Sequence, residues 1–183
     1  VHGGALLGRA TGIGSGLALG MGAASDVPFI LEFAVGVVAA VDGEKDPRCL
    51  LIALRLVATL LAPPSPLSPA SPAGAAGAGV VIGYGDAVAS YTQELFDVAA
   101  CYFPITFTPP PHDPHGITRE AMVGALRRVF AASPRMAPHV VPLLLEKLAS
   151  SVVDAKRDAL QTLMMCTPRY GVAAMLPLLP SLS

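Results

Sequence analysis

Apolar residues recur at helical spacing through the second half of the chain. One stripe occupies the positions i, i+3, i+4, i+7 and i+8 of a helix, namely Met122, Ala125, Leu126, Val129 and Phe130. Two more stripes follow, the first through Val140, Val141, Leu144, Leu145 and Leu148 and the second through Ala155, Ala159, Leu160, Leu163 and Cys166. Alternation with a period of two is almost absent outside residues 105–108. The pattern therefore predicts an all-α protein.

The residues at the expected helix ends agree with this pattern. Thr118 suits the N-cap of the helix that follows it, and Glu120 places a negative charge near the positive end of that helix. Pro138 fits a first helical turn, whereas Pro142 is expected to kink or shorten the same helix. Ser150-Ser151 is the only break between the second and third stripes.

The predicted helices follow one another as pairs joined by turns. The expected pairs are residues 29–41 with 49–61, about 87–102 with 118–132, and 140–148 with 155–166. In the first and last pairs a basic residue, Arg48 or Lys156, opens the second helix. This is the layout of a HEAT repeat. About three such pairs fit the chain, and because a single pair cannot bury its apolar face, neighbours must stack into an α-solenoid segment.

Composition divides the chain into four expected segments. Residues 1–24 are a Gly/Ala-rich low-complexity segment, and residues 25–62 hold the first helix pair. Residues 63–82 form a Pro/Ser/Gly/Ala linker, and residues 83–183 hold two further pairs and the start of the next. Glycine at every fourth position of the first segment resembles a membrane glycine zipper, but the stretch is too short to span a bilayer. We also expect the chain to be a piece of a longer protein.

Charge and apolar content limit the classes of function. The formal net charge of −1 gives no basic field for nucleic acid. A hydrophobic content of 53% raises a membrane interpretation, yet charges and prolines interrupt every apolar stretch before it reaches the length of a span. Cys49, Cys101 and Cys166 form no CxxC pair, so neither a zinc site nor a cluster site is indicated. We expect no bound cofactor, no direct nucleic acid contact and no membrane contact.

A charged turn, DGEKDPR at residues 42–48, is the first candidate interaction site. Gly43 suits a positive φ, Asp46 suits an N-cap, and Pro47 suits the first helical position. A satisfied inter-helix turn is therefore the favoured interpretation. The turn must nevertheless be exposed, so docking of a partner is compatible with it. The candidate residues for docking are Glu44, Lys45, Asp46 and Arg48.

A stiff aromatic and proline-rich connection at residues 95–116 is the second candidate. Its sequence is LFDVAACYFPITFTPPPHDPHG, and its prolines fix φ and push the preceding residues towards extended geometry. Tyr102, Phe103 and Phe107 are candidates for a peptide-binding patch. The favoured alternative makes these aromatics core residues that seal the connection onto the helices. In that case Phe103 fills the core and its loss destabilises the fold.

The end of this connection raises a third possibility. His112, Asp113 and His115 have side chains that bind zinc, but no further ligand cluster lies near them in the sequence. Hydrogen-bonded turn corners are the favoured interpretation, with Asp113 capping local N–H groups, and the three residues are kept as interaction candidates. The glycines at 83–85 do not continue into GxGxxG, and no GxSxG is present. We expect no enzymatic activity.

Long turn sequences of unusual composition carry a family resemblance. The chain has DGEKDPR at 42–48, CYFPI followed by PPP, DP and GI at 101–117, PLLLEK at 142–147 and AKRDALQTL at 155–163. Together these closely resemble the amino-terminal region of the MMS-nineteen family, which is named for methyl methanesulfonate sensitivity and nucleotide excision repair. The resemblance covers about residues 25–175. Residues 1–22 and 62–79 depart from it and look like lineage-specific low-complexity insertions.

The resemblance implies a large HEAT solenoid that acts as an adaptor of the cytosolic iron–sulfur assembly targeting complex. It implies that subunits of that complex and iron–sulfur clients such as repair helicases and polymerases are the partners. Nucleus and cytoplasm are the implied locations, with a further link to the repair and transcription factor TFIIH. Two alternatives stay open: a generic HEAT scaffold with other partners, and a metal-dependent enzyme that uses His112, Asp113 and His115.

Overall fold

The structure is a computed structural model that describes residues 27–63, 65–66, 81–82, 84–110 and 115–178. The expected low-complexity segment 1–24 and most of the expected linker 63–82 lie outside the described residues. Within them the α-helices are α2 (Val27–Val41), α3 (Pro47–Leu61), α4 (Thr92–Ala100), α5 (Arg119–Phe130), α6 (Ala137–Ala149) and α7 (Val153–Met175). Short 3₁₀ turns, η1 (Ala89–Tyr91) and η2 (Pro134–Met136), precede α4 and α6. The prediction of an all-α protein is confirmed.

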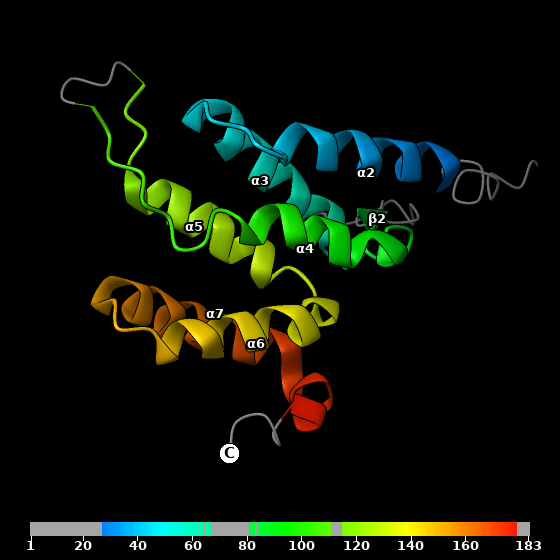
Figure 1. Cartoon of the computed structure of the whole chain (residues 1–183). Coiled ribbons are helices and arrows are strands. Elements are labelled where there is room, and N and C mark those ends of the chain that lie inside the picture. The colour runs from blue at the N-terminus through cyan, green and yellow to red at the C-terminus, as the bar shows by residue number, and fades with distance from the viewer. Residues whose placement is uncertain (1–26, 64, 67–80, 83, 111–114, 179–183) are drawn as a thin grey trace, which may run out of the picture.

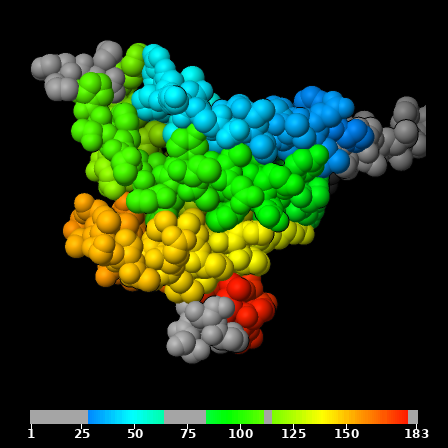
Figure 2. Space-filling view, in the orientation of Figure 1, coloured from blue at the N-terminus to red at the C-terminus, as the bar shows by residue number. Residues whose placement is uncertain are grey.

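The helices stack as three tiers, α2 with α3, α4 with α5, and α6 with α7, from top to bottom in Figure 1. Across the tiers α2 packs on α4 and α4 on α6, while α3 packs on α5 and α5 on α7. The first, third and fifth of these helices therefore form one layer, and the other three form a second layer. The same order of tiers, from blue through green to yellow and orange, runs down the surface in Figure 2. Each tier contacts chiefly its neighbours, which is the arrangement of an α-solenoid segment.

The apolar stripes form the core between the layers. All five residues of the first stripe are buried, and Leu54, Leu95 and Leu144 from three other helices are fully buried beside them. In the third stripe Leu160 is 51% exposed, so its expected place in the core is wrong. Asp158 and Thr162 are buried on this helix instead, together with Ala155, Ala159 and Cys166.

Three helices depart from their expected lengths. Helix α4 is shorter than predicted because η1 replaces its first turn and a non-helical turn begins at Cys101. Helix α6 runs through Pro142 without being shortened. Proline removes one helical hydrogen bond, and since Pro142 and Pro138 are both exposed, water can satisfy the carbonyl that loses its partner. Helix α7 continues past its apolar stripe but is broken at Gly171, whose φ of 71° and ψ of 171° are not helical, so the chain up to Met175 forms a second short helical segment.

A two-residue antiparallel strand pair is the exception to the helical pattern. Strands β1 (Ser65–Pro66) and β2 (Val81–Ile82) pair Ser65 with Ile82 and Pro66 with Val81. The sequence pattern gave no indication of this pair. It joins the chain leaving α3 to the chain that returns towards α4.

Gly85 fits closely against the end of α3. Its N–H donates to the carbonyl of Ala62 at 3.2 Å. A Cβ built on Gly85 would lie 2.8 Å from the carbonyl oxygen of Leu61 and 2.9 Å from that of Ala62. Both neighbours are backbone atoms, so they cannot turn away as a flexible side chain would.

Gly85→Ala is expected to lower the free energy of unfolding by about 1–3 kcal/mol, because the added methyl group would have to displace the end of α3. Gly36→Ala in α2 is the matched control, since a Cβ there meets nothing within 4 Å. The control is expected to raise stability by about 0.5–1 kcal/mol through the better helix propensity of alanine. Urea unfolding followed by circular dichroism measures both variants. Equal changes in the free energy of unfolding for the two variants would contradict the close packing of Gly85 against the end of α3.

Large exposed apolar side chains on the helices lie on α2, on α3 at Ile52, and on α7. Phe29 and Phe33 of α2 stack with ring centroids 6.0 Å apart, and Met164 and Val172 of α7 are 75% and 73% exposed. Among the described residues, helices α4, α5 and α6 of the interior have no such side chain. This is the distribution expected of helix pairs that stack in series. No helix in the described ranges is long and apolar enough to cross a membrane.

Candidate protein-interaction surface

The turn between α2 and α3 is held by its own side chains. Gly43 has φ 69°, and Oε1 of Glu44 accepts hydrogen bonds from the N–H groups of Lys45 and Asp46, both at 2.8 Å. Asp46 is the N-cap of α3 and accepts from the N–H of Arg48 at 2.8 Å. The predictions of a positive φ, an N-cap and a first-turn proline in this turn are confirmed.

Asp46 and Arg48 form a tight exposed pair in this turn. Nη2 of Arg48 lies 2.5 Å from Oδ2 of Asp46, and Nε lies 3.0 Å from Oδ1. Hydrogen bonds from the Arg48 side chain and backbone hold the pKa of the Asp46 carboxyl well below its usual range. Asp46 therefore stays ionised at any physiological pH and keeps its capping role.

Three polar contacts bring the aromatic connection onto this turn. The hydroxyl of Tyr102 donates towards the carbonyls of Val41 at 2.5 Å and Glu44 at 3.1 Å. Burial raises the pKa of Tyr102, which keeps the hydroxyl protonated as a donor. Nη1 of Arg48 lies 3.0 Å from Nε2 of His115. Two candidate segments that are about 60 residues apart in the sequence thus meet in space.

A pocket of about 250 Å³ lies where the two segments meet. We call its rim the loop surface and define it by the pocket-lining residues Glu44, Lys45, Tyr102, Pro104, Thr106 and Phe107. Lys45 and Thr106 are exposed, while Tyr102 and Phe107 are half-buried. The surface therefore offers one cation, one carboxylate and two aromatic rings around a cavity large enough for a single side chain.

Phe103 lies in the core rather than on the loop surface. Its ring is 9% exposed and meets the ring of Phe130 edge-on, with centroids 5.8 Å apart. The favoured interpretation of Phe103 as a core residue is confirmed, and its side chain is not available to a partner.

The histidine cluster is described only in part. His112 and Asp113 lie outside the described residues, and the exposed His115 contacts Arg48. Among the described residues no three His, Cys, Asp or Glu side chains come together as metal ligands would. The zinc interpretation of His112, Asp113 and His115 thus gains no support from the residues that the structure describes.

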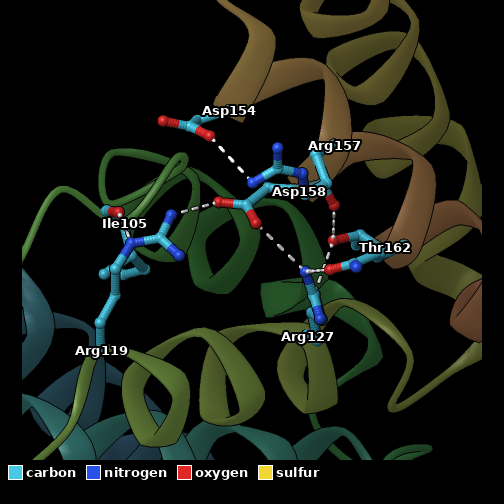
Figure 3. Close-up of polar contacts among 8 residues, drawn as sticks. Ile105, Arg119, Arg127, Asp154, Arg157, Asp158 and Thr162 are labelled. Carbon is cyan, nitrogen blue, oxygen red and sulfur yellow. Dashed lines mark hydrogen bonds and ion pairs between the residues drawn. The ribbon is translucent and has the colours of Figure 1, made fainter.

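A buried ion network between α5 and α7 was missed by the sequence analysis (Figure 3). Asp158 is 5% exposed and accepts from Nη2 of Arg119 at 2.6 Å and from Nη2 of Arg127 at 3.3 Å. Nε of Arg119 donates to the carbonyl of Ile105 at 3.1 Å, and Nε of Arg127 donates to Oγ1 of Thr162 at 3.2 Å. The network ties the second tier to the third and anchors the aromatic connection to both.

The sequence contains one indication of this network, a charged residue on the apolar stripe of α7. Asp158 and Thr162 occupy stripe positions between the buried Ala155, Ala159 and Cys166. A charged residue on a buried stripe needs a partner, because an isolated buried charge is very costly. Lys156 lies in the first turn of this helix, as predicted, and its side chain is exposed.

A second buried polar contact joins the same two tiers. The hydroxyl of Tyr170 donates to the carbonyl of Phe130 at 2.7 Å, near the C-terminal end of α5. Burial strongly raises the pKa of Tyr170, so this hydroxyl also remains a donor. The Asp158 network and the Tyr170 hydrogen bond thus hold the second and third tiers together beside the loop surface.

Comparison with known proteins gives consistent matches. The family model described as "Dos2-interacting transcription regulator of RNA-Pol-II", the MMS19 amino-terminal model, matches residues 20–183. The MMS19 nucleotide excision repair protein homolog of Homo sapiens is 44% identical over 151 residues, which is 82% of this chain and 13% of the human protein. The homolog of Arabidopsis thaliana is 42% identical over 138 residues, or 74% of this chain and 10% of the plant protein.

A more distant relative shows the same coverage. The MMS19 nucleotide excision repair protein homolog of Dictyostelium discoideum is 32% identical over 148 residues, which is 81% of this chain and 11% of that protein. The chain therefore spans 13% or less of the length of these three relatives.

Proposed function

Because the chain belongs to the MMS19 family and represents its amino-terminal region, we propose that it is part of a non-catalytic interaction scaffold for DNA repair and transcription. The relatives are named for nucleotide excision repair, and the family description names a regulator of RNA-Pol-II transcription. Stacked helix pairs are a common architecture for such scaffolds, since they present extended binding surfaces.

The finer proposal concerns iron–sulfur proteins. In it the scaffold belongs to the cytosolic iron–sulfur assembly targeting complex and holds apo-proteins of DNA repair, replication and transcription near the machinery that delivers clusters. The partners would be subunits of that complex and clients such as repair helicases and polymerases, in the nucleus and the cytoplasm. The segment itself would hold no cluster. The long turn motifs at 42–48 and 101–117, which resemble those of the MMS-nineteen family, support this proposal.

The loop surface is the structural feature that supports the proposal and identifies particular residues for it. Its two segments are held by Tyr102 and Arg48, so the exposed side chains of Lys45 and Thr106 sit on an ordered rim. Ordered rims lose little conformational entropy on binding, which favours specific recognition. Half-buried aromatic rings beside a small cavity are typical of the residues that dominate protein–protein affinity.

The experiment places Lys45→Glu and Thr106→Arg together in the full-length protein. Both residues are exposed, so the melting temperature should stay within about 2 °C of wild type. The expected result is a loss of at least about fivefold in co-purified iron–sulfur clients or complex subunits, measured by quantitative mass spectrometry. The control combines Lys147→Glu and Gln93→Arg, which change the net charge equally on α6 and α4, and should keep wild-type recovery.

Several outcomes would change the proposal. Unaltered recovery with the loop-surface variant would remove that surface from partner binding. Recovery of a partner set without iron–sulfur proteins or their assembly factors would favour a generic HEAT scaffold. Stoichiometric zinc or iron in the purified 183-residue chain would favour the metal-dependent alternative built on His112, Asp113 and His115.

A further inference from the structure

Charge is divided unequally between the two helix layers. The layer of α2, α4 and α6 carries one basic residue, Lys147, against the acidic residues Glu32, Glu94, Asp97 and Glu146. The layer of α3, α5 and α7 has the acidic residues Glu120, Asp154 and Asp158, which are outnumbered by the basic residues Arg48, Arg55, Arg119, Arg127, Arg128, Lys156, Arg157 and Arg169. A chain of nearly zero net charge thus has one basic layer and one acidic layer.

The basic layer contains a groove between α5 and α7 of about 220 Å³. We call it the α5–α7 groove. Its polar lining residues are Arg119, Glu120, Arg127, Asp154, Arg157 and Gln161, and Val123 and Gly124 complete its wall. Asp158 also lines it, but each of its carboxylate oxygens is already bound by a guanidinium (Figure 3). The buried carboxylate therefore holds the two arginines in place through one nitrogen of each.

The two fixed arginines keep unused donors. Arg119 donates through Nε and Nη2, and Arg127 donates through Nε and Nη2, while Nη1 of each has no hydrogen-bond partner among the described residues. Arg157 beside them has a side chain that is 63% exposed, and its bond to Asp154 at 3.1 Å joins two exposed groups. Exposed pairs of this kind contribute little and are readily exchanged for a better carboxylate partner.

We propose that the α5–α7 groove binds an extended, acidic polypeptide segment of a partner protein. The free Nη1 group of each fixed arginine can donate a charge-assisted hydrogen bond to a carboxylate, and arginines that are already held in place lose less entropy when they bind. Side chains on one face of an extended peptide repeat about every 7 Å, so alternating acidic residues would present a row of carboxylates to the groove.

Two features favour a polypeptide over nucleic acid. Glu120 and Asp154 lie on the groove and would repel a continuous line of phosphates, whereas a peptide can place neutral residues beside them. The groove is lined by Val123 and Gly124 and by no aromatic residue on which a base could stack. The inference stands apart from the loop surface and does not depend on which partners the scaffold serves.

The test is direct binding to the purified 183-residue chain. The probe is a fluorescein-labelled decapeptide of alternating glutamate and glycine, followed by fluorescence anisotropy at low and physiological salt. We expect saturable binding that weakens with salt, and no binding of the corresponding lysine–glycine peptide. Arg157→Glu should weaken binding by about fivefold or more, and Glu120→Gln should tighten it by about twofold. Lys147→Glu, with the same charge change on the acidic layer, should leave binding within twofold.

Each contrary result is decisive. Absence of binding by the wild-type chain, or equal losses with Arg157→Glu and Lys147→Glu, overturns the proposal. Tighter binding of a ten-nucleotide oligo-dT than of the acidic peptide, with the same dependence on Arg157, would assign the groove to nucleic acid instead. Arg157→Gln, which only removes the charge, should show a smaller loss than Arg157→Glu and guards against a folding defect in the charge reversal.

Discussion

Asp158→Ala is expected to lower the free energy of unfolding by about 3–5 kcal/mol. The substitution leaves Arg119 and Arg127 without the carboxylate that accepts from both of them. The side chain of Arg127 is only 19% exposed, so solvent cannot fully replace the lost partner. Since α5 belongs to the second tier and α7 to the third, the loss should loosen the contact between them.

Urea unfolding of the 183-residue chain measures this effect, and α7 offers a matched control four residues earlier. Asp154 pairs with Arg157 at the surface, with both side chains more than 60% exposed, so Asp154→Ala should change stability by no more than about 0.5 kcal/mol. The loss of stability caused by Asp158→Asn should lie between those of Asp154→Ala and Asp158→Ala, because the amide oxygen can still accept one hydrogen bond. Similar losses for Asp154→Ala and Asp158→Ala would mean that burial of the network contributes nothing.

Phe103→Ala is expected to destabilise the chain by about 3–5 kcal/mol. Phe103 is 9% exposed, packs on Phe130 and borders a small enclosed space that is also lined by Ile105, Val123 and Leu126. Alanine would leave a cavity at the point where the aromatic connection enters the core. For a chain of this size the loss corresponds to a fall of roughly 6–20 °C in the melting temperature.

Thermal unfolding by circular dichroism tests this expectation, with Phe107→Ala as the comparison. Phe107 is half-buried on the loop surface, so its loss should cost distinctly less than the loss of Phe103. A melting temperature unchanged by Phe103→Ala, together with reduced recovery of partners, would return Phe103 to the interaction surface.

Local signals in the sequence sufficed to predict most of the helices. Spacing of apolar residues located the stripes of α5 and α6, and the caps at Asp46 and Thr118 are correct to the residue. These features depend on neighbours within a turn or two of helix, so the sequence contains all the information that they need. The length of α7 was underestimated because its first helical part runs past the apolar stripe to the break at Gly171.

Contacts between distant residues could not be predicted in the same way. Tyr102 reaches Val41 across 61 positions, and Arg119 reaches Asp158 across 39. Only the stacking of tiers brings such residues together, and a single sequence does not show which aromatic or arginine will face which acceptor. The sequence therefore indicates each of the two loop segments as a candidate site but not that they meet.

The strand pair β1–β2 and the contact of Gly85 with Ala62 hold together the two ends of the connection between α3 and α4. This affects how the protein can vary and be engineered. Ser65 lies beside Ile82, and Gly85 contacts Ala62. The point where the chain leaves α3 is therefore close to the point where it returns towards α4. The spacing of the flanking helices is then independent of how many residues lie between Pro66 and Val81. Evolution can lengthen or shorten that interval without disturbing the tiers. For the same reason it is a favourable position for inserting an affinity tag or a fluorescent reporter into the intact protein.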